Sequence, residues 1–123
     1  MTKQMSYTKI ENQLRPIFRE RLDQAESVED VKKFFVYTIQ ELLENAMGEN
    51  GTVRFEDVCL DPDNEPGFAL GPGITERPAF QEVWTDSDMS RIVGMFAETA
   101  RNRYRRLEKN PAKTEAKMYH GHD

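Results

Sequence analysis

Apolar residues recur at spacings of three and four in three stretches of the chain, which is the period of a helix with one buried face. This spacing predicts helices over residues 6–26, 28–47 and 85–110. The middle stretch carries apolar residues beyond a single stripe, so we expect it to be buried on more than one side. Ser27 would cap its first turn and Gly48 would end it.

Two features bear on the first of these helices. Thr8 and Glu11 have the spacing of a capping box, in which the Thr8 side chain accepts a hydrogen bond from the Glu11 amide. Pro16 has no amide hydrogen and its ring crowds the preceding turn. We therefore expect a kink or a break near Arg15.

Shorter stretches alternate between apolar and polar residues, as half-buried strands do. They predict a strand over residues 52–55, a second over 80–84 and a third, very short one over 68–70. The alternation changes phase at Glu56–Asp57, which either a β-bulge or a helical turn explains.

The predicted order of elements is therefore α-α-β-(loop)-β-α. It indicates an α+β fold, with three main helices packed on one face of a small antiparallel sheet. A chain of 123 residues is long enough for one domain with its own core. We expect this domain to span residues 1–110 and a flexible tail to follow over residues 111–123.

The loop at residues 61–78 interrupts the helical pattern. It contains four of the six prolines and three of the seven glycines, which exclude a long helix or a central strand. An irregular segment of this length within a small domain is either functional or disordered. Its apolar residues Phe68, Leu70 and Ile74 favour an ordered binding loop.

Side chains in and around this loop form a candidate ligand site. Carboxylates can act as acid–base groups or metal ligands, arginines can hold an anion, and aromatic rings can form a wall. One hypothesis is thus a small-ligand protein or metal-dependent enzyme with its pocket under the loop. The candidate residues are Arg54, Asp57, Asp61, Phe68, Arg77 and Trp84.

Trp84 is also expected to have a structural role. Thr85 and Asp88 have the spacing of another capping box, which would place Trp84 and Met89 at the two positions of a hydrophobic staple. We therefore expect Trp84 to be buried and its removal to destabilise the fold. A Trp84 that is exposed and needed only for binding would instead be a ligand contact.

Charge is segregated along the chain, whose formal net charge is −5. Residues 41–88 contain twelve acids and two bases, whereas residues 91–109 contain six bases and two acids. Opposite zones favour electrostatic docking, within one chain or between copies. The basic residues expected to interact are Arg101, Arg105 and Arg106. They also raise the hypothesis of nucleic-acid binding, which the acidic zone disfavours.

Cysteine and histidine provide no catalytic or metal-binding motif. The single cysteine, Cys59, excludes an intramolecular disulfide. Its apolar neighbours and the nearby acids predict a buried, unreactive thiol. His120 and His122 both lie in the predicted tail, and two histidines there are too few for a four-ligand site. We expect neither a cofactor nor a metal centre.

These observations favour a binding protein over an enzyme. The start of the chain lacks the apolar region of a signal peptide, and no run of apolar residues is long enough to span a membrane. We therefore expect a small cytoplasmic assembly or regulatory module that acts by protein–protein interaction. The segregated charge and the wide apolar face of residues 28–47 favour a homodimer.

Overall fold

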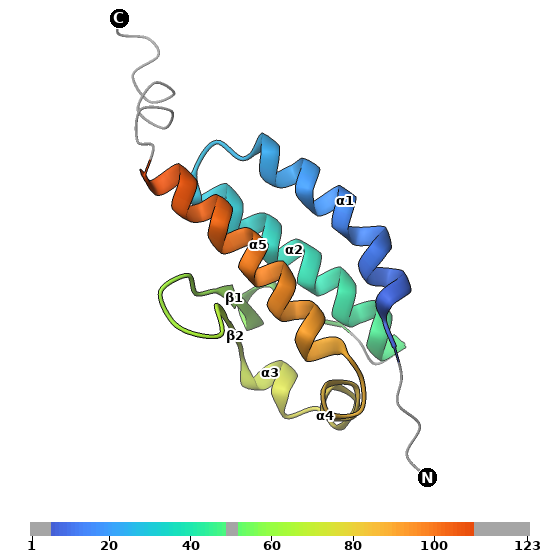
Figure 1. Cartoon of the computed structure of the whole chain (residues 1–123). Coiled ribbons are helices and arrows are strands. Elements are labelled where there is room, and N and C mark those ends of the chain that lie inside the picture. Colours follow the sequence, from blue (N-terminus) through green and yellow to red (C-terminus); the bar gives the residue numbers. More distant parts are fainter. Residues whose placement is uncertain (1–5, 49–51, 110–123) are drawn as a thin grey trace, which may run out of the picture.

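The computed structural model of the protein describes residues 6–48 and 52–109. Figure 1 shows three long helices, α1, α2 and α5, lying side by side, with a small hairpin and two short helices beside them. This is the predicted α+β fold, although two short helices that were not predicted follow the sheet and precede α5 in the sequence. The elements are α1 (Thr8–Gln24), α2 (Val28–Met47), the 3-10 turn η2 (Phe55–Asp57), β1 (Val58–Leu60), β2 (Phe68–Leu70), α3 (Pro72–Thr75), α4 (Pro78–Thr85) and α5 (Met89–Lys109).

The helix α2 forms the centre of the core. It contacts α1, α5, α4 and β1, so the prediction that it is buried on more than one side is confirmed. An edge-to-face contact between Phe18 and Phe96, with ring centroids 5.3 Å apart, joins α1 to α5 beside it. The side chains of α2 that are completely removed from solvent are Val31, Phe35, Ile39, Leu42 and Leu43.

Both predicted ends of α2 are confirmed. The Ser27 hydroxyl accepts a hydrogen bond from the Asp30 amide at 3.2 Å, which satisfies one of the free amides of the first turn. Gly48 follows the helix with φ of 71°, a backbone angle that glycine adopts without steric cost.

The helix α1 differs from the prediction at two points. It continues without a break through Pro16, because Leu14, Phe18 and Leu22 bury one face of it on both sides of the proline. This packing outweighs the one backbone bond that proline removes. The predicted capping box is also wrong, because Thr8 is already the first helical residue and its hydroxyl bonds Asp88.

The predicted strand over residues 80–84 is wrong, because these residues belong to the helix α4. Pro78 occupies its first position, where the missing amide hydrogen costs nothing. Phe80, Val83 and Trp84 are three and four residues apart, so a helix places them on one face. The rings of Phe80 and Trp84 stack there with centroids 5.1 Å apart.

The predicted strand over residues 52–55 is also wrong. Val53 is buried, as expected, but its backbone pairs with side chains of α2 and not with a strand. Gln40 Nε2 donates to the Val53 carbonyl at 2.8 Å, and the Val53 amide donates to Glu44 Oε2 at 3.0 Å. The turn η2 then causes the change of phase at Glu56–Asp57, so the helical turn was the correct alternative.

The short strand predicted over residues 68–70 is confirmed as β2, which pairs antiparallel with β1. Val58 lies opposite Leu70, and Leu60 lies opposite Phe68. The side chains of Val58 and Leu60 are buried, so this face of the hairpin lies against the helices.

The start of the last helix was predicted four residues too early. Thr85 ends α4, and α5 begins at Met89. Ser87 connects the two helices, since its hydroxyl donates to the Val83 carbonyl and accepts from the Met89 amide at 3.0 Å. The predicted capping box of Thr85 and Asp88, and the staple of Trp84 on Met89, are therefore wrong. The predicted tail, with His120 and His122, lies outside the described residues.

Trp84 still has a packing role, although it is only partly buried. Its ring contacts Phe80 on its own helix and Phe68 on β2, so it joins α4 to the hairpin. Trp84→Ala should lower the free energy of unfolding by about 2 kcal/mol, below the cost for a fully buried aromatic. Urea denaturation measures the change. Ile17→Ala, at a position 46% exposed on α1, is the control and should change it by less than about 0.5 kcal/mol.

Candidate functional site

The turn between the two strands, residues 61–67, is held against the basic half of α5. Arg101 Nε and Arg105 Nη2 both donate to the Pro62 carbonyl, at 3.2 and 2.8 Å. Arg101 Nη1 also lies 3.3 Å from Glu65 Oε2. The acidic and basic zones of the sequence therefore meet within one chain at this place.

Gly67 is required for this close approach. Its φ of 100° is one that other residues rarely adopt, and an added Cβ would lie 2.8 Å from Arg101 Cδ. The turn is closed by hydrogen bonds from the Asp61 amide to the Gly67 carbonyl at 2.8 Å and from the Gly67 amide to the Asn64 carbonyl at 2.7 Å. Residues 61–67 are therefore an ordered part of the fold.

The three arginines predicted to interact have different surroundings. Arg101 and Arg105 are occupied by residues 61–67, as described above. Arg106 is exposed and takes part in none of the hydrogen bonds or ion pairs found among residues 6–48 and 52–109. Arg106 is the member of this group that is left available to a ligand.

Two of the six candidate ligand-site residues are brought together. Phe68 and Trp84 have ring centroids 6.1 Å apart. Arg54 is exposed. The Asp61 carboxylate accepts hydrogen bonds from the side-chain nitrogen of Asn64, Nδ2, within its own turn. Arg77 is the N-cap residue of α4.

The sixth candidate, Asp57, lies against the glycines of the loop. Its carboxylate is so close to Gly71 and Gly73 that no other residue fits at either position without displacing it. Its Oδ2 atom is buried and has no hydrogen-bond partner among the described residues. None of the six candidates lines the groove between α2 and β1 or the groove between α1 and α5, so the pocket under the loop stays a prediction.

Metal ligands are not gathered in the part of the chain that the structure describes. Within residues 6–48 and 52–109, no group of three or more histidine, cysteine, aspartate or glutamate side chains is arranged to hold a metal ion.

In the same residues, no helix combines the length and the apolar character needed to cross a membrane.

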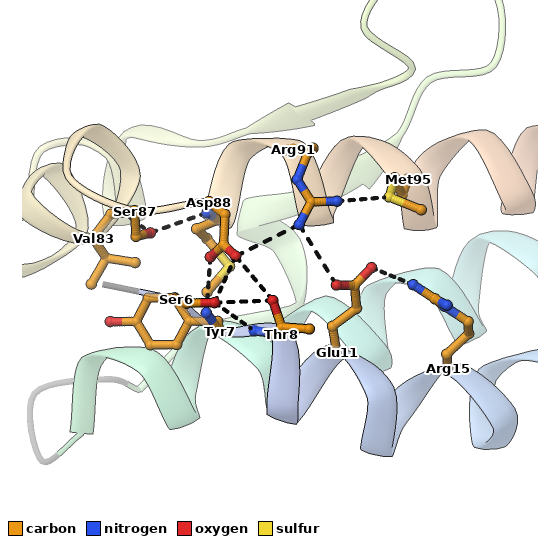
Figure 2. Close-up of polar contacts among 11 residues, drawn as sticks. Ser6, Tyr7, Thr8, Glu11, Arg15, Val83, Ser87, Asp88, Arg91 and Met95 are labelled. Carbon is orange, nitrogen blue, oxygen red and sulfur yellow. Dashed lines mark hydrogen bonds and ion pairs between the residues drawn. The ribbon is translucent and has the colours of Figure 1, made fainter. Parts of the chain in front are cut away.

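A polar cluster that the sequence did not reveal joins the start of α1 to the start of α5 (Figure 2). Asp88 Oδ1 accepts from the Tyr7 amide at 2.8 Å. Asp88 Oδ2 accepts from the hydroxyls of Ser6 at 3.0 Å and Thr8 at 3.3 Å. Burial by itself raises the pKa of Asp88, but these hydrogen bonds outweigh it and hold the pKa below its ordinary value.

Tyr7 is affected in the opposite direction. Burial raises the pKa of its hydroxyl, and the carboxylates of Asp88 and Glu82 raise it further. The phenol therefore stays protonated and neutral at physiological pH.

Glu11 extends this cluster along α1. Its side chain is only 3% exposed, and it forms ion pairs with Arg15 and, at 3.9 Å, with Arg91. Arg91 also lies 3.6 Å from Asp88, so it links the two carboxylates. The sequence could have indicated a buried, paired Glu11, because Glu11 falls on the apolar stripe of α1 and Arg15 follows it by four residues.

A groove lies between the outer flank of α2 and the strand β1. Its walls combine apolar side chains with charged side chains from the first turns of α2. The lining residues are Glu29, Asp30, Lys32, Lys33, Val36, Phe55, Val58, Cys59 and Leu60.

Two aromatic rings stand exposed beside this groove. Tyr37 and Phe55 are 44% and 46% exposed, and their ring centroids lie 5.6 Å apart. Cys59 is exposed as well, so the prediction of a buried thiol is wrong. The reason is the alternation of β1, which turns Val58 and Leu60 to the core and Cys59 to the opposite face.

The known proteins provide no guide to this surface. Comparison of the chain with models of protein families, with curated proteins and with solved structures gave no match.

The polar cluster predicts a pH dependence of stability. Because the folded-state pKa of Asp88 is lowered, its stabilisation is present above the unfolded-state pKa and is lost as the pH falls through the folded-state pKa. Asp88→Asn should therefore lower the free energy of unfolding at pH 7, by about 1 kcal/mol. The difference should narrow at pH 3, below the ordinary aspartate pKa of about 3.9.

Denaturant titrations at the two pH values measure this difference. Asp63→Asn is the matched control, since Asp63 is exposed and forms no hydrogen bond or ion pair found among the described residues. An Asp88→Asn variant that is equally destabilised at both pH values would show that the carboxylate charge is not responsible.

Proposed function

We propose that this protein is a binding module that acts by protein–protein contact, and that its partner is a second copy of the chain. The observation that supports the proposal is the unpaired edge of β1, which lies in the groove on α2 beside two exposed aromatic rings. Its cytoplasmic location and any regulatory role stay predictions from the sequence.

Hydrogen-bonding positions alternate along the strand β1. The Gly71 amide donates to the Asp57 carbonyl at 2.8 Å, and the Asp61 amide donates to the Gly67 carbonyl at 2.8 Å. In an antiparallel pair, every second residue bonds to the neighbouring strand. The backbone groups of Val58 and Leu60 therefore point to the other edge of β1.

This other edge offers one acceptor and one donor. The Val58 amide bonds the Phe55 carbonyl in the turn η2, and the Leu60 carbonyl accepts from the Cys59 thiol at 3.4 Å. The Val58 carbonyl and the Leu60 amide are left without a hydrogen-bond partner among the described residues. Unpaired backbone groups at the edge of a sheet favour the addition of another strand, and at this edge Val58 and Leu60 are themselves only 3% and 2% exposed, so the added strand would have to enter the groove beside them.

A second copy of β1 fits this pair of groups. If two copies lie antiparallel about a two-fold axis at Cys59, the Leu60 amide of each copy faces the Val58 carbonyl of the other. The free donor of each edge then meets the free acceptor of its partner. The groove also contains two acids and two lysines. Because these charges balance, two copies of the groove do not repel each other.

The aromatic rings supply the apolar part of the contact. Two backbone hydrogen bonds alone contribute only about 1 kcal/mol each. Tyr37 and Phe55 are each more than two-fifths exposed beside the same edge, and large aromatic residues are typical anchors of interfaces. Their burial against a second copy would provide most of the stabilisation.

Size-exclusion chromatography with light scattering tests the dimer. The full chain should be a dimer at high micromolar concentration. Tyr37→Asp and Phe55→Asp should shift it to monomer, because each places a charge in the contact. Ile17→Asp, at a position 46% exposed on α1, is the matched control and should remain dimeric.

Cysteine oxidation provides an independent check of the two-fold arrangement. Opposite residues at a non-hydrogen-bonded position have Cα atoms about 4.5 Å apart, which a disulfide can span. Mild oxidation should therefore link two chains through Cys59, and Cys59→Ser should abolish the link. A chain that stays monomeric at high micromolar concentration and does not cross-link would refute the proposed dimer.

A further inference from the structure

A second groove, away from β1, lies between α1 and α5. Its position is set by the packing of these two helices, which meet through Phe18 and Phe96. Polar and charged side chains from both helices line it. They include Arg19 and Asp23 from α1 and Asn102, Arg103 and Arg106 from α5.

The arginines of this groove form no ion pair with a carboxylate in the part of the chain that the structure describes. Arg19 and Arg106 are exposed and form no hydrogen bond or ion pair found within residues 6–48 and 52–109. The Asp23 carboxylate also lines the groove but forms no ion pair with them in that part of the chain. Three guanidinium groups against one carboxylate give the groove a surplus of positive charge.

Arg103 is fixed in place at the end of α1. Its Nη2 atom donates to the carbonyls of Asp23 and Ala25, each at 3.3 Å. Its Nε atom is buried without a hydrogen-bond partner among the described residues. Arg103 therefore contributes a charge whose position is set by the fold, with Arg19 and Arg106 free to close on a ligand.

We propose that this groove binds the phosphate groups of a small molecule. Guanidinium groups bind phosphate oxygens through paired, charge-assisted hydrogen bonds. The Asn102 amide adds a neutral donor at the same place. This ligand site is separate from the contact proposed for β1 and does not depend on it.

The surroundings favour a compact anion over a nucleic acid. Arg101 and Arg105 contact residues 61–67, so the arginines of α5 do not form one continuous basic stripe. The chain as a whole carries a net charge of −5, which repels a long polyanion. A groove with three arginines is suited to one or two phosphate groups.

Pyrophosphate is the probe for the experiment, which uses isothermal titration calorimetry on the full chain at low ionic strength. Pyrophosphate should bind, and added NaCl should weaken the binding. The variant Arg19→Gln/Arg106→Gln should bind at least about tenfold more weakly, because it loses two charge-assisted contacts. Its unfolding midpoint without pyrophosphate should be unchanged, since neither side chain forms a hydrogen bond or ion pair found among the described residues.

The matched control is Lys9→Gln/Arg21→Gln, which removes two positive charges from α1 outside the groove. It should bind pyrophosphate within about twofold of the original chain, the size expected when only distant, screened charges change. Equal weakening in both double variants would mean that pyrophosphate responds only to net charge, and the groove would be excluded. An absence of binding would overturn the proposal, as would unchanged binding in Arg19→Gln/Arg106→Gln.

A labelled DNA duplex of 20 base pairs tests the alternative that the groove binds nucleic acid. It should not bind under conditions in which pyrophosphate does. A duplex that binds more tightly than pyrophosphate, and loses that binding in Arg19→Gln/Arg106→Gln, would replace the small phosphate ligand with a nucleic acid.

Discussion

The enclosure of α2 is the constraint on which the rest of the structure depends. α1, α5, α4 and β1 all contact this helix, and its central residues Phe35, Ile39 and Leu42 have no exposed area. Burying this much apolar surface supplies most of the free energy that holds a small domain together. The positions of α1, α4, α5 and β1 relative to each other follow from their contacts with α2.

Two sets of polar contacts fix the ends of α1 and of the hairpin relative to α5, in addition to the apolar packing. Asp88 connects the first residues of α1 to α5, and Arg101 holds the turn of the hairpin at the other half of α5. Both connect segments that are far apart in the sequence. A buried carboxylate such as Glu11 is costly without cationic partners, which Arg15 provides from α1 itself and Arg91 provides from α5.

The same packing leaves two different surfaces open. The flank of α2 that faces away from the other helices carries Tyr37 beside the free edge of β1. The crossing of α1 and α5 leaves a groove in which Arg19 and Arg106 have no described partner. We propose a protein partner for the first surface and a small anion for the second, and both surfaces result from the way three helices and a hairpin surround one core.

Local signals predicted α2 correctly, because both of its caps and its apolar face lie within the helix itself. Residues 80–84 were misread because an apolar set at positions 80, 83 and 84 within five residues fits a strand as well as a helix. The partner of Val53 could not be foreseen, since Gln40 precedes it by thirteen residues and a helix side chain replaces a strand.

The candidate site was predictable only in part, for the same reason. Segregated charge indicated that acidic and basic zones would meet. It did not reveal that Arg101 and Arg105 would bind a backbone carbonyl at Pro62. The groove of Arg19 and Arg106 depends on two helices about eighty residues apart in the sequence, which no local pattern encodes.

Native-state hydrogen exchange tests the central role of α2 most directly. If α2 is enclosed as described, the amides of Phe35–Leu43 should exchange only through global unfolding, with a free energy equal to that from denaturant titration. Amides of α4 should exchange through smaller, local openings. Exchange of the α2 amides at free energies as low as those of α4 would contradict the account, because the centre of the core would then open without the rest of the protein.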